Sequence, residues 1–390
     1  MKINRKFELI ADFIRTSFKK DIEFIALHEP IFNGNEIKYS TNAIESTFVS
    51  SVGEYVNKFE EDIAKYTGAA KAVACVNGTS ALHLALILAG VEQGDEVITQ
   101  DLTFIATTNA IRYCNADPIF LDVDRNTFGL SPIALKDWLD ENVDIVEVNR
   151  VKQAINKKTG ATIRACVPMH TFGHPCDMDS IMAVCNEYGI NVIEDAAESM
   201  GSFYKGKHTG TIGFIGVVSF NGNKIITTGG GGMLLFNDNE LAAKAKHLST
   251  QAKVPHAWEY KHDQVGYNYR MPNINAAIGV AQLEELNSFV TRKRKLSELY
   301  FDFFKSIDIE FLKEPSNSES NYWLNAILLK DKEERNDFLG YMNGQKIMTR
   351  PLWEPMHTLP MNKNAQHGDL SNTIYLSERI VNIPSSAIVL

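Results

Sequence analysis

Val192-Ile193-Glu194-Asp195-Ala196-Ala197-Glu198-Ser199 decides the fold, together with Val218-Ser219-Phe220-Asn221-Gly222-Asn223-Lys224. Each stretch begins as a short apolar run, which predicts a buried strand. The first run ends in a carboxylate, and the second leads to a lysine that the glycine-rich segment 229–232 follows. In open α/β sheets, ligands bind beyond the carboxyl ends of the strands. We therefore expect Asp195 and Lys224 to face one site.

An amine and a carboxylate in this arrangement suit a pyridoxal 5'-phosphate (PLP) site. Lys224 supplies an amine that can form a Schiff base with the cofactor aldehyde. Asp195 supplies a negative partner that keeps the ring nitrogen protonated. Each residue alone has a simpler interpretation, because an aspartate at a strand end can cap a turn and a lysine can be solvated. Gly78 and His170 also follow apolar runs, and this convergence favours the site.

Composition excludes several classes of protein. The 390 residues are 44% hydrophobic and 22% charged, as in a globular protein with a large core. The net charge of −9 comes without a long Lys/Arg run, which argues against nucleic-acid binding. The five cysteines never have CxxC spacing, so we expect buried free thiols and no metal site. With no apolar run of about 18 residues and no signal peptide, we expect a cytoplasmic protein without a membrane partner.

Apolar runs alternate with helical patterns over the first two thirds of the chain. The predicted strands, with helices between most of them, are 71–76, 96–99, 118–124, 165–170, 190–193 and 233–236. Because these strands are apolar throughout, the fold class is α/β, with a mainly parallel sheet between helices. The first strand leads through Asn77-Gly78-Thr79-Ser80 into a helix, and such an N-terminus can bind an anion or be an ordinary N-cap. We expect residues 144–158 to be an irregular insert.

The two ends of the chain have less regular patterns. Residues 6–24 have the spacing of an amphipathic helix, whose apolar stripe we expect to pack on the body or on a second subunit. Beyond residue 272, helices and a strand mix without strict alternation. We therefore expect three parts, which are an N-terminal helical extension at 1–27, a large α/β domain at 28–255 and a small α+β C-terminal domain at 256–390.

Five motifs stand in one order that resembles the DegT–StrS family of PLP-dependent sugar aminotransferases, of fold type I. They are Asn77–Leu82, Thr103–Thr107, Glu194–Ala197, Ser219–Gly232 and Gly266–Met271. The loops His28–Glu36 and Val49–Gly53 are similar to those of the LegC-like subgroup. The resemblance runs from about His28 to the C-terminus.

The resemblance implies a role for each matching residue. Lys224 binds the cofactor covalently, Asp195 pairs with its ring nitrogen and Phe104 stacks on the ring. The phosphate is held by Gly78, Thr79 and Ser219, and by Asn268 of a neighbouring subunit. Glu198 stands where the family places a polar side chain beside the ring hydroxyl. Substrate contacts are implied for Ser51, Tyr269 and Arg350.

The resemblance also implies a reaction and an assembly. Glutamate donates an amino group to C4 of a nucleotide-linked 4-keto-6-deoxy-(N-acetyl)hexosamine, with UDP as the expected nucleotide. The product enters surface glycan or nonulosonic acid biosynthesis, and the enzyme is a homodimer with shared active sites. Two alternatives are a PLP-fold sugar dehydratase and a non-catalytic regulatory PLP-binding protein. Those dehydratases carry His where this chain has Lys224, and a protein without catalysis has no need of both Lys224 and Asp195.

Overall fold

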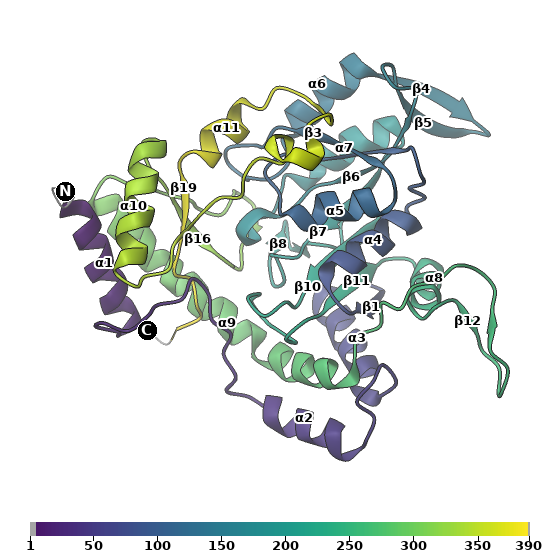
Figure 1. Ribbon diagram of the computed structural model, residues 1–390, viewed down its shortest axis with the longest axis horizontal. Helices are drawn as coiled ribbons and strands as arrows, with labels where there is room; N and C mark the ends of the chain where they lie inside the picture. The colour runs from purple at the N-terminus through teal and green to yellow at the C-terminus, as the bar shows by residue number, and fades with distance from the viewer. Residues whose placement is uncertain (1–4, 389–390) are drawn as a thin grey trace.

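A twisted sheet forms the centre of the computed structural model, which describes residues 5–388 (Figure 1). Its main path has the strand order β1-β11-β10-β7-β6-β2-β3-β18. The strands are β1 Lys71–Cys75, β2 Glu96–Gln100, β3 Asp117–Leu121, β6 Thr162–Val167, β7 Asn191–Asp195, β10 Ile215–Ser219, β11 Gly232–Phe236 and β18 Gln366–His367. Among them only β11 runs against the rest. The carboxyl ends of β1, β10 and β7 therefore lie at one edge, which confirms the expected fold class.

Helices cover both faces of this sheet, because alternate residues of the buried strands are apolar on both sides. Val73, Val217 and Ile193 face one hydrophobic cluster. That cluster includes residues of α4 Gly78–Leu88, α5 Ile105–Tyr113 and α8 Asn239–Ser249. The opposite face packs on α6 Pro132–Asn142, α7 Met178–Tyr188, α3 Glu54–Thr67 and the first part of α9 Asn273–Ser306.

The long helix α9 connects the central sheet with a second, smaller sheet (Figure 1). The order of that sheet is β14-β16-β19-β17, with β14 Glu310–Phe311, β16 Asn325–Leu328, β17 Arg350–Pro351 and β19 Ile380–Ile383. The N-terminal helix α1, Arg5–Phe18, packs against this part and against α10 Lys332–Gly344. The apolar stripe of α1 thus packs on the body of the same chain.

The prediction of an irregular insert after α6 is wrong. This segment is a β-hairpin of β4 Val143–Val148 and β5 Val151–Asn156, which projects from the sheet beside β6 (Figure 1). Its two turn residues, Asn149 and Arg150, have φ values of 52° and 66°. Positive φ at both positions matches a type I′ turn, the two-residue connection that suits the twist of a hairpin.

Short elements complete the chain between these larger ones. They are α2 Glu36–Glu45, β8 Phe203–Tyr204, β9 Lys207–His208, β12 Lys253–Val254, β13 Lys261–His262, β15 Ser318–Glu319, α11 Ser371–Ser377 and the 3₁₀ turns Thr171–Gly173, Met356–Thr358 and Pro360–Asn362. All five cysteines are buried and free, as expected. Within residues 5–388, no helix has the length and apolar character needed to cross a membrane.

Replacing Phe338 by Ala tests the core that anchors α1. Phe338 is fully buried on α10, and its ring meets Phe7 of α1 edge to face at 5.2 Å between centroids. The substitution should lower the free energy of unfolding by about 3–5 kcal/mol, measured by chemical denaturation. Leu299→Ala, at an exposed position of α9, is the control and should change it by less than about 1 kcal/mol. Equal effects of the two substitutions would contradict this packing.

Candidate active site

Asp195 is the last residue of β7, and its carboxylate is held in a fixed orientation. It is 2% exposed. Oδ2 accepts a hydrogen bond from the Thr107 hydroxyl of α5 at 2.6 Å, and Oδ1 accepts one from the Ala197 N–H at 3.1 Å. Burial raises the pKa of Asp195, whereas these bonds act in the opposite direction. The carboxylate is thus positioned from two sides at the carboxyl edge of the sheet.

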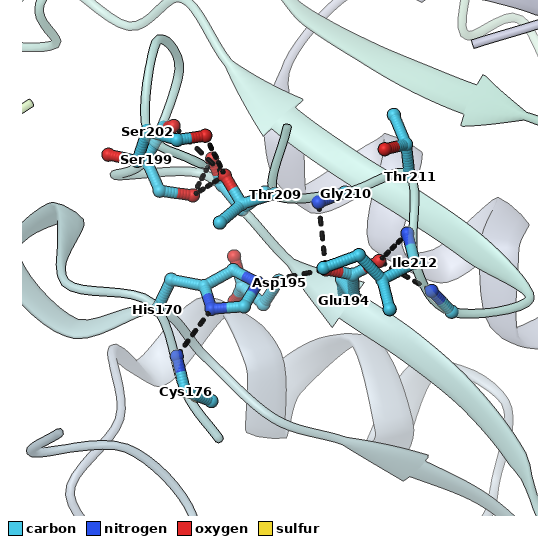
Figure 2. A network of polar contacts seen from close by, with 12 residues as sticks. His170, Cys176, Glu194, Asp195, Ser199, Ser202, Thr209, Gly210, Thr211 and Ile212 are labelled. Carbon is cyan, nitrogen blue, oxygen red and sulfur yellow. Dashed lines mark hydrogen bonds and ion pairs between the residues drawn. The ribbon is translucent and has the colours of Figure 1, made fainter. Parts of the chain in front are cut away.

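Glu194, the preceding residue, points to the other face of β7 and has a different role. Its Oε1 accepts the N–H groups of Ile212 at 2.7 Å and Gly213 at 2.6 Å (Figure 2). Its Oε2 accepts the Gly210 N–H at 2.8 Å and lies 3.1 Å from His170 Nε2. Burial alone would raise the pKa of Glu194, but these donors lower it below its ordinary value. Glu194 therefore joins β7 to the segment that leads into β10.

His170 belongs to this structural network and is fully buried. Its Nδ1 accepts the N–H of Cys176 at 3.1 Å, so the ring proton is on Nε2 and faces Glu194 (Figure 2). With both ring nitrogens engaged, His170 anchors this part of the chain. We conclude that His170 follows an apolar run for a structural reason.

Lys224 lies just beyond the end of β10, after the turn at 220–223. Its Nζ is 3.4 Å from Glu198 Oε1 and 3.9 Å from the centroid of the Trp323 indole ring. The lysine side chain is only 12% exposed. The amine is therefore enclosed between a carboxyl group and an aromatic face.

Glu198 is buried three residues beyond Asp195 and is the strongly perturbed acid of this site. Burial raises the pKa of Glu198 to about 7, although the Lys224 ammonium acts to lower it. Its Oε2 accepts the N–H of Phe172 at 2.9 Å, and its backbone carbonyl accepts the Asn321 side-chain amide at 2.9 Å. A carboxyl group with this pKa, next to an amine, can exchange a proton near neutral pH.

The N-terminus of α4 closely approaches the end of β10. A Cβ on Gly78 would lie 3.1 Å from Ser219 Cβ and 3.2 Å from its Oγ, so a larger residue would crowd this junction. The Asn77 side chain accepts the Ser80 N–H at 2.7 Å, which caps the helix. The N–H groups of Gly78 and Thr79 lie in the first turn, where helices have no internal acceptors. These residues fit a phosphate group.

Phe104 immediately precedes α5 and leaves its ring 48% exposed. A phosphate cradle, an oriented carboxylate, an amine and an accessible aromatic face are the groups that hold and activate PLP. The residues of the chain fit this cofactor. The structure brings Asp195, Glu198 and Lys224 together, and it brings Gly78 to Ser219.

The other predicted site residues lie elsewhere on the same chain. Asn268 is exposed, and its Oδ1 accepts a hydrogen bond from Arg270 at 3.1 Å. Ser51 and Arg270 line a hollow of about 720 Å³ next to the β12–β13 hairpin. The Tyr269 hydroxyl lies 2.9 Å from Nδ1 of His83, on α4. Arg350 is on the outer strand β17, is exposed, and donates hydrogen bonds to Asn343 of α10 and to the carbonyl of Thr349.

Trp323 and Asn321 also contact the site residues, and neither was predicted to do so. They lie in the segment that immediately precedes β16. Asn321 binds the backbone carbonyls of Glu198 and Met200, each at 2.9 Å. An aromatic residue in an apolar run is normally core, so the available signal was the polar Asn321 at the start of that run.

Comparisons with known proteins show what this chain is similar to. The model of the DegT/DnrJ/EryC1/StrS aminotransferase family matches residues 30–389. GDP-perosamine synthase of Escherichia coli O157:H7 is 40% identical over 366 residues, covering 93% of this chain and 94% of that protein. GDP-perosamine synthase of Vibrio cholerae is 37% identical with the same coverage. The crystal structure of the aminotransferase TlmJ from Streptoalloteichus hindustanus has a TM-score of 0.83 and 27% identity, covering 93% and 94% of the two chains.

The chain therefore belongs to the DegT/DnrJ/EryC1/StrS aminotransferase family. It is an enzyme, a PLP-dependent sugar aminotransferase that acts on a nucleotide sugar. The family resemblance drawn from the five motifs is confirmed.

Glu198 gives the site a pH dependence that can be measured. Because burial raises the pKa of Glu198 to about 7, its stabilising contribution is complete below its unfolded pKa and is lost as pH rises through 7. The side chain of Glu198→Gln stays neutral, so this variant does not lose that contribution. Between about pH 4 and about pH 8, the difference in free energy of unfolding, variant minus parent, should therefore rise by up to about 3 kcal/mol. Chemical denaturation across pH measures this, with the exposed Glu61→Gln as control. Parallel curves for parent and Glu198→Gln would contradict it.

Proposed function

We propose that this enzyme transfers an amino group from glutamate to C4 of a nucleotide-linked 4-keto-6-deoxy sugar. The observation that supports this most is the Lys224 amine, enclosed 3.4 Å from a buried Glu198 whose pKa is raised to about 7. A 1,3-proton shift needs a group that accepts and returns a proton near working pH. Lys224 provides that group, and Glu198 is placed to hold or release the proton between steps.

The other site residues bind and orient. PLP supplies an electron sink for the carbon that loses its proton. Asp195, already held by Thr107, pairs with the ring nitrogen. Gly78, Thr79 and Ser219 bind the phosphate, and Phe104 covers one ring face.

The nucleotide is the finer part of the proposal. The LegC-like loops imply a UDP-linked N-acetylated sugar, whereas two relatives are named GDP-perosamine synthases. We favour a GDP-linked sugar on the strength of 37–40% identity over nearly the whole chain. We further propose that the enzyme is cytoplasmic and serves surface glycan synthesis. Its proposed parts are the N-terminal extension at 1–27, the large domain at 28–255 and the small domain at 256–390.

A panel of 4-keto nucleotide sugars with glutamate tests the reaction. The parent protein should form 2-oxoglutarate and an aminated sugar, with the GDP-linked substrate preferred over UDP- and dTDP-linked ones. Lys224→Ala should fold and retain PLP but lose at least about 10³-fold in turnover. The readouts are product mass and the absorbance change on adding glutamate. Parent-like turnover by Lys224→Ala would show that another residue carries the chemistry, and no product from any sugar would refute the substrate class.

The active enzyme is proposed to be a homodimer with shared sites. Large apolar side chains are exposed in the loop before α3 and on the β12–β13 hairpin, which projects from the body (Figure 1). These side chains are Phe48, 59% exposed, Val52, 65%, Trp258, 79%, and Tyr260, 83%. Clustered exposed apolar surface is typical of a protein interface. Ser51 and Asn268 lie in this region, so a second copy bound here would receive them.

Mixing two inactive variants tests the shared site. Lys224→Ala lacks the amine, and Asn268→Ala lacks the contact that one copy would give to the other. If sites are shared, unfolding and refolding the equimolar mixture should recover about a quarter of parent activity, because half the dimers are mixed and each has one intact site. Light scattering gives the mass. A mixture no more active than the sum of its parts, or a monomeric mass, would contradict the proposal.

A further inference from the structure

Trp323 is fixed against the backbone of the reactive lysine. Its indole Nε1–H donates a hydrogen bond of 2.7 Å to the carbonyl of Asn223, the residue before Lys224. The ring is 5% exposed. The ring is hydrogen-bonded to the peptide that precedes Lys224, and its face lies against Nζ. The position of the ring therefore fixes the position of the amine.

The backbone of Trp323 makes two hydrogen bonds of its own. Its N–H donates to Asn321 Oδ1 at 2.8 Å, and its carbonyl accepts from the Lys293 amine at 3.1 Å. Lys293 is fully buried on α9 and also donates to the carbonyl of Ser385. Three hydrogen bonds thus fix this residue, two through its backbone and one through its indole ring.

The aromatic face of Trp323 is placed to hold the lysine amine. Nζ lies 3.9 Å from the ring centroid, well within the range of a cation–π interaction. This interaction stabilises the ammonium and offers nothing comparable to the neutral amine. Glu198 at 3.4 Å acts in the same direction when it is ionised.

We propose that Trp323 is a positioning residue that holds the Lys224 amine whenever that amine is not bound to the cofactor. The inference rests on the proposed role of Lys224 and adds a role for a residue in the C-terminal part of the chain. In each half of the transfer, the freed lysine must stay close to the reacting atoms. The aromatic face keeps it within reach and shields it from water and other reagents.

Chemical labelling of Lys224 tests this without any turnover. The full chain, with PLP released as its oxime by hydroxylamine and removed by dialysis, is treated with a low concentration of acetic anhydride, and mass spectrometry follows acetylation of Lys224. The exposed Lys330 serves as an internal reference. Trp323→Leu should raise the relative labelling rate by roughly fivefold or more, because both shielding and cation stabilisation are lost. Trp323→Phe, which retains an aromatic face, should stay within about twofold of the parent.

Trp138→Leu is the matched control, because Trp138 is a buried tryptophan of α6 in a separate hydrophobic cluster. Its labelling rate should equal that of the parent. Circular dichroism and thermal melting verify that each variant is folded. A parent rate in folded Trp323→Leu would overturn the inference, and so would equal acceleration in Trp323→Phe and Trp323→Leu. These outcomes are independent of the sugar panel, which tests the reaction itself.

Discussion

Two adjacent carboxylates, Glu194 and Asp195, end β7, and the site depends on the hydrogen bonds that each of them accepts. A buried carboxylate without donors is costly. Glu194 avoids that cost by accepting four hydrogen bonds, three of them from the backbone N–H groups at 210–213. Those bonds fix the start of β10 relative to β7. The end of β10 at Ser219, and Lys224 beyond it, are thereby fixed relative to Asp195, which faces the other side of β7.

The C-terminal part of the chain completes this arrangement from a distance in sequence. Asn321 contacts the backbone of Glu198, and Trp323 contacts both the peptide and the amine of the Lys224 turn. Burial lowers the pKa of Lys293 far below its ordinary value, so this lysine donates hydrogen bonds with less charge to bury. Lys293 lies on α9, which packs against both sheets, so this support is continuous with the large core.

Sequence patterns predicted the parts of this structure that local chemistry decides. Apolar runs located the strands, and Asp195, Lys224 and Gly78 follow them at one edge because parallel strands share their carboxyl ends. The hairpin after α6 was missed because its turn, Asn149–Arg150, lacks the glycine that usually marks such turns. Trp323 was missed because its contact with Lys224 joins residues about a hundred positions apart, and no local periodicity encodes such a pair.

The β4–β5 hairpin extends well away from the site, and its tip carries no residue of the cofactor cradle (Figure 1). A ladder of six paired residues on each strand supports the turn. Foreign peptide spliced between Asn149 and Arg150 would begin and end at neighbouring points, so it would strain neither strand. This loop therefore offers a place to attach the enzyme to a surface or a fluorophore while leaving both chain ends untouched.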